Sequence, residues 1–417
     1  MRRVYLDVIG TLPTAKEVTR FLEDDRPDNR NVLIDELLQR DEFADYWSLR
    51  WCDLLRVKSE FPINLWPNAA QAYHRWVRAG IQANKPYDQF VREVLTSSGS
   101  NFRVPPVNFY RAIQGTAPET VADAVALTFM GTRTRRWPEK RRLQMAQFFA
   151  GIQSKRTSEW KEEIVSVDLL GTAATKQTEY AILPDGTRVD LPVATDHRQV
   201  FADWLIRPDN PWFTGNIVNR IWYWLFGIGI VHEPDDIRHD NPPTNRELLA
   251  VLQRELVGSD FDLKHIYRLM LNSATYQRSC IPTTDQPEAE LHFAHYPIRR
   301  LDAEVLIDAV CQITGTTESY SSLIPEPWTF IPGSERSICL ADGSITSPFL
   351  ELFGRPARST GYASERGTAP SAAQKLHLLN SSHIQQKLEA SVAAVPAMET
   401  RGRGRRRGRS TMARMSN

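Results

Sequence analysis

The densest group of side chains that could do chemistry lies in a loop bounded by Pro234 and Pro242. Closely spaced carboxylate and carbonyl oxygens are the ligands that Ca²⁺ prefers, and a carboxylate beside a histidine can transfer protons. Asp235, Asp236 and His239 are therefore catalytic candidates, and the two aspartates are also candidates for a metal site. The alternative is a loop held by Asx turns and helix caps, because no Asp-x-Asp-x-Asp-Gly pattern is present. The polar residues of this loop are His232, Asp235, Asp236, His239, Asp240 and Asn241.

Arg220 precedes this loop in an apolar run, where a charged side chain needs a partner. Asp235 or Asp236 can supply that partner, since a carboxylate accepts two parallel hydrogen bonds from a guanidinium. We therefore expect a structural ion pair. In the alternative interpretation, Arg220 faces a ligand and joins the catalytic candidates. The further binding candidates near it are Asn219, Trp222 and Asn241.

A second acidic run, Glu-Trp-Lys-Glu-Glu at residues 159–163, opens a stretch of β-favouring sequence. Two carboxylates that flank a cleft are the catalytic groups of a glycosidase, and Glu162 is the binding candidate in this run. The alternative is a solvated run of charges, because the sequence identifies no partner carboxylate across a cleft.

Tryptophan is abundant, with 11 residues in the chain. Exposed aromatic faces could form a platform that binds carbohydrate. At helical spacing, however, aromatic side chains commonly pack into the core, and we expect that of most of them. The tryptophans in question are Trp47, Trp51, Trp66, Trp76, Trp204, Trp212, Trp222 and Trp224.

Several signatures of enzyme classes are missing from the sequence. The chain has no Gly-x-Gly-x-x-Gly, P-loop, Gly-x-Ser-x-Gly or His-Glu-x-x-His pattern, so nucleotide binding, α/β-hydrolase chemistry and zincin chemistry lack their characteristic residues. The spacing of the four cysteines specifies neither a zinc site nor a disulfide framework. They are Cys52, Cys280, Cys311 and Cys339.

Charge is unevenly distributed along the chain. The formal net charge is +1, but residues 401–417 contain seven arginines and no acid, so the first 400 residues carry −6. An Arg/Gly-rich segment without aromatic residues binds phosphates and acidic polymers by counterion release. We expect non-specific anion binding by the tail from Arg401 to Arg409, and we do not expect nucleic acid to be the main partner.

Length and composition bound the class of protein. A chain of 417 residues has room for two or three domains, and 41 % hydrophobic with 24 % charged residues excludes wholesale disorder, collagen-like repeats and disulfide-rich miniproteins. No apolar run approaches the roughly 20 residues of a transmembrane helix, so we expect no transmembrane segment. No signal peptide is visible at the N-terminus.

Hydrophobic periodicity predicts helices through most of the chain. Thr14 and Glu17 form a capping-box pattern before a helix at residues 15–24, and Thr244 and Glu247 form another before residues 246–257. Further apolar periodic stretches lie at residues 32–38, 43–55, 69–83, 87–96, 118–130 and 140–152. In the second part of the chain they lie at residues 196–206, 212–226, 263–274, 299–313 and 372–388.

Three stretches depart from this helical pattern. Residues 155–191 contain two β-favouring runs with Asp185-Gly186 as a hairpin signal. Residues 315–370 are rich in Ser, Gly and Pro, which predicts a long irregular excursion packed on the helices. Beyond residue 395 we expect disorder.

Long motifs of this sequence resemble a pair of domains of unknown function from planctomycetes, PSCyt followed by PSD, that are associated with cytochromes. The first domain resembles Arg-Arg-Val-Tyr-Leu-Asp-Val-Ile-Gly-Thr-Leu-Pro-Thr at residues 2–14, Trp-Cys-Asp-Leu-Leu-Arg at residues 51–56 and the segments at 84–90 and 128–133. The second resembles residues 216–229, 235–236, 241–243, 273–276 and 376–382. The resemblance covers nearly everything from residue 2 to about residue 390.

Two departures from the family pattern bear on cofactors. Many relatives carry Cys-x-x-Cys-His after the position of Arg133, whereas residues 134–139 here read Thr-Arg-Arg-Trp-Pro-Glu. Some relatives also carry cysteines in the loop that matches residues 360–366, and this chain has none there. The resemblance therefore implies no haem on this chain and no site built from both loops, so no cofactor is expected, with Ca²⁺ as the one possibility.

The family pattern usually extends upstream of residue 2, often through an exported cytochrome-like or sugar-binding-like module. On this resemblance we expect that Met1 is not the natural start and that the protein is periplasmic or exported.

These observations predict a mainly α protein, with two helical domains at residues 1–153 and 196–392, a β-rich insert at 154–195 and a disordered tail at 393–417. The leading hypothesis is an accessory envelope protein that binds a partner protein or polysaccharide. One alternative is a hydrolase-like enzyme acting on carbohydrate, whose candidate residues would converge in one pocket. A second alternative is a component of a cytochrome-linked redox system. The candidates for the enzyme are Asp235, Asp236, His239 and Arg220.

Overall fold

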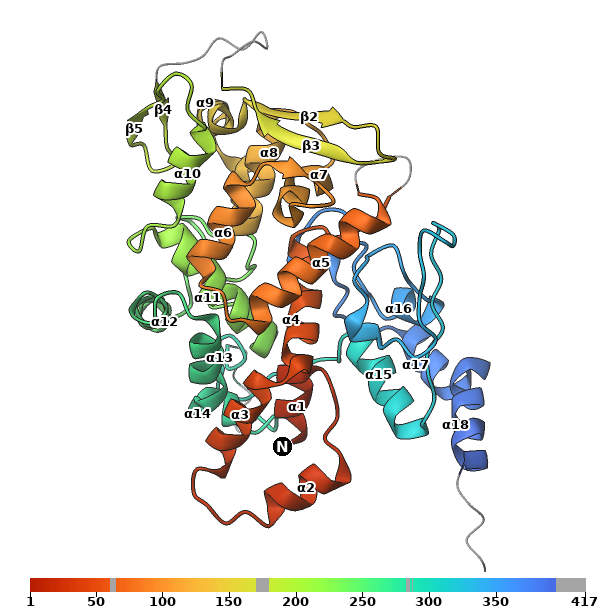
Figure 1. Cartoon of the computed structure of the whole chain (residues 1–417). Coiled ribbons are helices and arrows are strands. Elements are labelled where there is room, and N and C mark those ends of the chain that lie inside the picture. Colours follow the sequence, from red (N-terminus) through yellow and green to blue (C-terminus); the bar gives the residue numbers. More distant parts are fainter. Residues whose placement is uncertain (61–64, 170–179, 283–285, 287, 395–417) are drawn as a thin grey trace, which may run out of the picture.

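The chain folds into a mainly α-helical structure, as the sequence predicts. The computed structural model describes residues 1–60, 65–169, 180–282, 286 and 288–394, with 53 % helix and 6 % strand. Figure 1 shows that the helices of the first part and those of the second part lie against each other along most of their length, with two small sheets at one end.

The α-helices described in the first part of the chain are α1 (Arg2–Ile9), α2 (Ala15–Leu22), α3 (Asn29–Gln39), α4 (Asp41–Leu54), α5 (Pro67–Gln82), α6 (Tyr87–Thr96), α7 (Asn108–Ala112), α8 (Pro118–Val125) and α9 (Glu139–Ala146). Thr14 and Glu17 form the predicted capping box of α2, in which each side chain accepts a hydrogen bond from the other residue's backbone. Helix α8 continues as a π-helix over Ala126–Met130, which Gly131 ends in the left-handed conformation.

Five short strands form two antiparallel sheets near the predicted insert. Strands β2 (Ile152–Arg156) and β3 (Glu163–Val167) form a hairpin, and β1 (Gly99–Ser100) pairs with the other edge of β3. Strands β4 (Tyr180–Ile182) and β5 (Arg188–Asp190) flank the predicted Asp185-Gly186 turn. The β-rich insert is therefore confirmed, although β1 lies earlier in the chain.

The second part contains α10 (His197–Leu205), α11 (Pro211–Phe226), α12 (Arg246–Gly258), α13 (Leu263–Asn272), α14 (Ala274–Gln277), α15 (Ala303–Thr314), α16 (Pro348–Leu352), α17 (Ala372–Asn380) and α18 (Ser382–Ala394). The capping box predicted at Thr244 and Glu247 is wrong. Asn245 caps α12 instead, because its side chain accepts a hydrogen bond from the backbone of Leu248, and the Thr244 hydroxyl donates to the Ile230 carbonyl.

Helix α4 is central to the hydrophobic core, which includes residues from both parts of the chain. The ring centroid of Trp47 lies 4.3 Å from that of Tyr267 and 5.6 Å from that of Trp224. Tyr87 stacks on Phe213 at 4.6 Å with an interplanar angle of 8°. The two parts of the chain thus share one core, and aromatic packing of this kind contributes beyond the buried area.

The irregular excursion between α15 and α17 is confirmed for residues 315–370. It contains only a 3-10 turn at Ser337–Cys339, the short helix α16 and a 3-10 turn at Ala363–Glu365. A second, smaller core attaches it to α15 through Ala303, Ile307, Leu340, Ile345, Phe349, Leu350 and Phe353. The predicted disorder beyond residue 395 lies outside the described residues. Among those described, no helix combines the length and apolar character needed to cross a membrane.

Candidate functional site

Arg220 and Asp235 form the ion pair that the sequence predicts. Their closest nitrogen and oxygen atoms are 2.7 Å apart, and the two side chains are 1 % and 0 % exposed. The Arg220 guanidinium also donates to Asn216 Oδ1 and to the Leu127 carbonyl, while Asp235 accepts from the backbone N–H of Ala363 at 2.7 Å. The pair therefore joins α11 to the loop after it and to the late irregular segment, and the two buried charges neutralise each other.

The other loop candidates lie nearer the surface. Asp236 contacts Arg238 at 3.2 Å and Arg136 at 3.6 Å, and His239 is exposed. Asn241 donates to the carbonyls of Asp236 and His232. These contacts fit the alternative interpretation, in which turn hydrogen bonds hold the loop.

The binding candidates on α11 are buried. Asn219 donates to the Val231 carbonyl and accepts from the Val231 N–H, both at 2.9 Å. Trp222 is 2 % exposed and stacks on Phe226. Of the eight tryptophans considered for a platform, six are buried and two are partly buried against the core, which favours the core interpretation.

Glu162 is buried, which the interpretation as a solvated charge run does not predict. Its carboxylate accepts hydrogen bonds from Ser100 at 2.5 Å and Thr157 at 2.7 Å. Hydrogen bonds from these two hydroxyls lower the pKa of Glu162. It therefore holds the β2–β3 turn in place as an ionised group.

The four catalytic candidates do not converge in one pocket. Arg220 and Asp235 are buried together, whereas His239 points into solvent at the surface of the loop. Within the described part of the chain, no group of three or more His, Cys, Asp or Glu side chains is arranged to hold a metal ion. The carboxylate of Asp235, proposed as a Ca²⁺ ligand, is already neutralised by a guanidinium.

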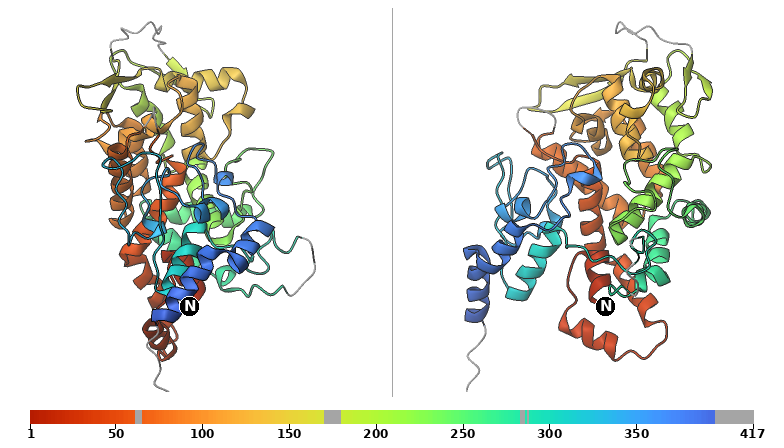
Figure 2. Two further views of the ribbon diagram at one scale, coloured as in Figure 1. Left: turned by 90° about the vertical axis from the view of Figure 1, so that its right-hand side faces the viewer. Right: turned by 180° about the vertical axis from the view of Figure 1, so that it is seen from behind.

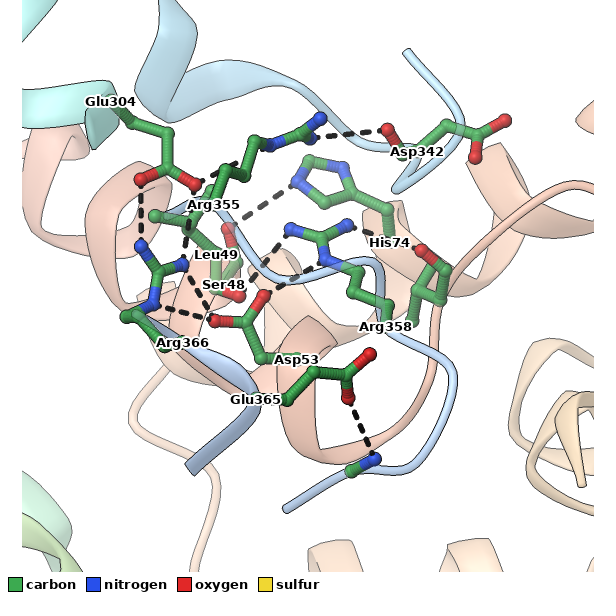
Figure 3. A network of polar contacts seen from close by, with 12 residues as sticks. Ser48, Leu49, Asp53, His74, Glu304, Asp342, Arg355, Arg358, Glu365 and Arg366 are labelled. Atoms are coloured by element: carbon green, nitrogen blue, oxygen red, sulfur yellow. Dashed lines mark hydrogen bonds and ion pairs between the residues drawn. The ribbon is translucent and has the colours of Figure 1, made fainter. Parts of the chain in front are cut away.

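A cluster of buried ion pairs elsewhere was not predicted. We call it the charged seam, because it joins α4 to the C-terminal part of the chain (Figure 3). Asp53 on α4 accepts from Arg358 at 2.9 Å and from Arg366 at 2.7 Å. Arg366 also donates to Glu304 at 2.7 Å. The members of the charged seam are Arg50, Asp53, Asp302, Glu304, Arg355, Arg358 and Arg366.

The Asp302 carboxylate of the charged seam is held in its ionised form. Burial alone would raise the pKa of Asp302, but the nearby cations Arg50, Arg366 and Arg299 lower it to about 2. Carboxylates paired in this way are poor proton donors near neutral pH.

A serine–histidine pair lies behind Arg358 in the same region (Figure 3). Ser48 Oγ is 3.4 Å from His74 Nε2, but the side chains are 0 % and 7 % exposed and Ser48 donates to the Asp45 carbonyl. Burial, reinforced by Arg358 and two other arginines, lowers the pKa of His74 to about 3. An imidazole with so low a pKa is a weak base, and the buried pair is closed to substrate, so it does not form a nucleophilic site.

A cleft with a volume of about 480 Å³ lies over the charged seam, at the C-terminal end of α11. Arg50, Asp53, Asp302 and Arg366 form its polar floor, and its walls are mostly apolar or aromatic. The wall residues include Leu54, Tyr223, Trp224, Phe226, Ile228, Pro297, Ile298, Pro356, Tyr362 and Pro370. A half-open apolar cleft with a few convergent polar groups is the common form of a binding site.

One rim of the cleft is an irregular, extended segment at residues 297–302. The backbone N–H groups of Ile298, Arg299 and Arg300 have no hydrogen-bond partner among the described residues. The Ile298 side chain is 82 % exposed. The rim therefore presents both free main-chain groups and apolar surface.

Sequence reasoning missed this site because its residues come from an irregular region without periodicity. The one usable signal was the set of arginines at 355, 358 and 366, in a segment whose apolar neighbours predict partial burial. Buried arginines require carboxylates, and Asp53 lies in one of the motifs already noted.

Comparison with known families and proteins adds a family assignment. The model of PSD1, described as a protein of unknown function (DUF1553), matches residues 197–415, which is more than half of the chain. The model of PSCyt2, likewise described as a protein of unknown function (DUF1549), matches residues 1–169. No match to a curated protein or to a solved structure was found.

Proposed function

The chain belongs to the PSD1 family, with a PSCyt2 domain ahead of the PSD1 domain, and on that premise we propose that it is an accessory protein that binds an extended segment of a partner protein. The observation that carries this proposal is the cleft over the charged seam. Its apolar walls can take side chains, and its rim at residues 297–302 offers unpaired main-chain groups. Extended peptides bind such edges through main-chain hydrogen bonds, and neighbouring pockets select their side chains.

The composition of the cleft favours binding over catalysis. Two of the three carboxylates in the described lining, Asp53 and Asp302, are paired with arginines, so Glu290 stands alone where a glycosidase needs two catalytic carboxyl groups, and the described lining contains no histidine or cysteine. A hydrolase needs a carboxyl group that can give up or take a proton near neutral pH. The residues nominated for a hydrolase lie outside the cleft, so no observation favours that alternative.

The proposal also includes that the protein carries no haem and that it is exported or located in the cell envelope. Peptide binding in the cleft needs no haem, and the stretch after Arg133 forms a 3-10 turn at Thr134–Arg136 from which Arg136 reaches Asp236. An exported or envelope location is part of the proposal on the strength of the family resemblance alone.

The proposal is tested by selecting random peptides on the immobilised whole chain and measuring their affinities by fluorescence anisotropy. Placing a charge on the apolar rim with Ile298→Glu is expected to weaken the selected peptides roughly tenfold or more. Ile281→Glu is the matched control, because Ile281 is 73 % exposed and lies outside the cleft. Failure to select any peptide, or equal binding by both variants and the wild type, would contradict the proposal.

A further inference from the structure

Three tryptophans from distant parts of the chain meet at the surface. Trp66 caps the N-terminal end of α5, Trp160 lies in the β2–β3 turn, and Trp328 lies in the irregular excursion after α15. The ring centroid of Trp66 is 6.5 Å from that of Trp160 and 5.7 Å from that of Trp328, and both pairs are edge-to-face. Figure 1 shows the β2–β3 turn beside the start of α5.

The two outer rings of this tryptophan cluster are accessible. Trp160 is 63 % exposed and Trp328 is 47 % exposed, whereas Trp66 between them is 8 % exposed. Folded proteins rarely leave several large aromatic rings exposed side by side, because such a patch costs free energy in water unless it has a ligand. The tryptophan cluster is therefore a candidate ligand-binding surface.

A polar pocket of about 380 Å³ adjoins the cluster. Trp66 and Trp160 form part of its wall, and Leu65 is the only aliphatic residue among the described lining. Its remaining described lining is Glu60, Arg111, Arg156, Thr157, Ser158, Glu159, Lys161, Glu162 and Glu163. None of these residues lines the cleft over the charged seam, so the two sites are separate.

Trp66 supplies an independent indication that a ligand binds here. Its indole Nε1 is buried and has no hydrogen-bond partner among the described residues. A buried N–H without an acceptor costs about 1–3 kcal/mol, so such groups normally have a partner. Trp66 lines the adjoining pocket, and a small shift of its ring on ligand binding would bring this N–H to an acceptor oxygen there.

The chemistry of the pocket selects the class of ligand. Four carboxylates and three cations line its wall, so the net charge is small and a strongly charged ligand is not favoured. A wall that mixes donors and acceptors suits a ligand with many hydroxyl groups, each of which both donates and accepts. With one aliphatic side chain in the described lining, the pocket has little room for the apolar side chains by which peptides are recognised.

We propose that the tryptophan cluster and the adjoining pocket bind a neutral polysaccharide. The apolar face of a sugar ring, whose C–H groups carry partial positive charge, stacks on the electron-rich faces of Trp160 and Trp328. The hydroxyl groups at the edge of the ring reach the polar wall, and one of their oxygens accepts the hydrogen bond from Trp66 Nε1. This site does not depend on the peptide cleft.

The proposal is tested by titrating the whole chain with neutral hexasaccharides, using isothermal calorimetry and tryptophan fluorescence. The probes are the β-1,4 and β-1,3 glucose hexamers, the xylose hexamer and the N-acetylglucosamine hexamer. We expect at least one of them to bind, and Trp160→Ala and Trp328→Ala each to weaken it roughly tenfold or more, because a stacked aromatic anchor dominates such contacts. Tyr180→Ala, which removes an exposed aromatic ring from β4, is the matched control and should bind normally.

Trp66→Phe provides a finer test, because it keeps a ring and removes only the N–H. Thermal stability should not fall, since the lost donor has no partner among the described residues, while saccharide affinity should fall several-fold. Ile298→Glu in the peptide cleft should leave saccharide affinity unchanged, which separates this site from the proposed function.

Three outcomes would overturn the proposal. One is that none of the four hexasaccharides binds. Another is that Trp160→Ala and Trp328→Ala both bind the saccharide as strongly as the wild type does. The third is that a galacturonate hexamer or a proline-rich peptide occupies the cluster more tightly than every neutral sugar, which would assign the surface to an acidic polymer or to a protein.

Discussion

Helix α4 joins the two parts of the chain through two unlike surfaces. On one side, Trp47 and Trp51 pack against Trp224 and Tyr267 of α11 and α13, and we call this the aromatic seam. On the other side, Asp53 binds the arginines of the charged seam. Figure 1 and the right-hand view of Figure 2 show α15 to α18 on one side of α4 and α11 to α14 on the other.

The two seams differ in what they require of their residues. Aromatic rings gain stability from any close apolar contact, so the aromatic seam tolerates small shifts of position. Each charge of the charged seam is stable only with its own partner, because a buried ion left alone carries the full cost of desolvation. The aromatic seam therefore stabilises the contact through buried apolar area, and the charged seam fixes how the late segment sits on α4, where it forms the floor of the cleft.

The largest loss of stability is expected from Trp47→Ala in the aromatic seam. Trp47 is 1 % exposed, contacts four aromatic rings and donates from Nε1 to the Val8 carbonyl. Its removal leaves a large cavity and should lower the free energy of unfolding by about 3–5 kcal/mol. Urea unfolding followed by circular dichroism measures this loss. A loss no greater than that of Trp76→Ala, at a partly buried site, would mean that the aromatic seam is not the main contact.

A slightly smaller loss is expected from Asp53→Asn in the charged seam. The amide keeps the shape of the carboxylate but leaves Arg358 and Arg366 without their shared countercharge. The expected decrease in unfolding free energy is about 3 kcal/mol, at the lower end for a broken buried pair. Adding Arg358→Met, which removes the cation whose only carboxylate partner among the described residues is Asp53, should recover part of this loss in the same urea experiment. No recovery in the double variant would contradict the assignment of the cost to an unpaired charge.

Acid should weaken the region of the charged seam through His74, whose pKa in the folded protein is lowered from 6.5 to about 3. Between these two values the unfolded chain binds a proton that the folded chain does not, so stability falls as pH falls from 6.5 towards 3. The loss for this group is about 2 kcal/mol by about pH 5. His74→Gln should flatten this part of the pH profile of unfolding free energy. An unchanged slope would show that the folded imidazole is protonated.

The smallest effect is expected at a surface pair outside both seams. Arg20 and Glu36 are 2.6 Å apart at their closest atoms, but their side chains are 66 % and 47 % exposed. Arg20→Ala should change the free energy of unfolding by less than about 1 kcal/mol, because water screens exposed pairs. If Arg20→Ala and Asp53→Asn lowered the free energy of unfolding equally, burial would not determine how much an ion pair contributes to stability.

The seams also explain which parts of the molecule could be predicted from the sequence. Helices such as α4, α6 and α11 were predicted because their apolar residues repeat with the helical period. The pairing of Arg220 with Asp235 was predicted because a charge in an apolar run requires a partner. Helix α1 was missed because it has only eight residues, and its N-cap, Met1, makes no side-chain capping hydrogen bond.

The cleft and the tryptophan cluster could not be predicted in the same way. Trp66 and Trp160 were visible as residues, but nothing local to either indicates that their rings meet across separate elements. Likewise, Arg358 and Arg366 lie in irregular backbone, so no hydrophobic periodicity indicates that their side chains are buried. Contacts of this kind follow from tertiary packing, which a single sequence encodes only through the complete fold.

Asp53 and Arg366, which form a hydrogen bond in the folded protein, are synthesised at widely separated times. The two residues are 313 positions apart, which at about 5–20 residues per second corresponds to roughly 15–60 s of synthesis on the ribosome. Asp53 therefore leaves the ribosome well before its arginine partners are synthesised. The rings of α4 likewise leave it before their partners Trp224 and Tyr267. The nascent first part therefore displays an unpaired aromatic face until the second part of the chain has been synthesised.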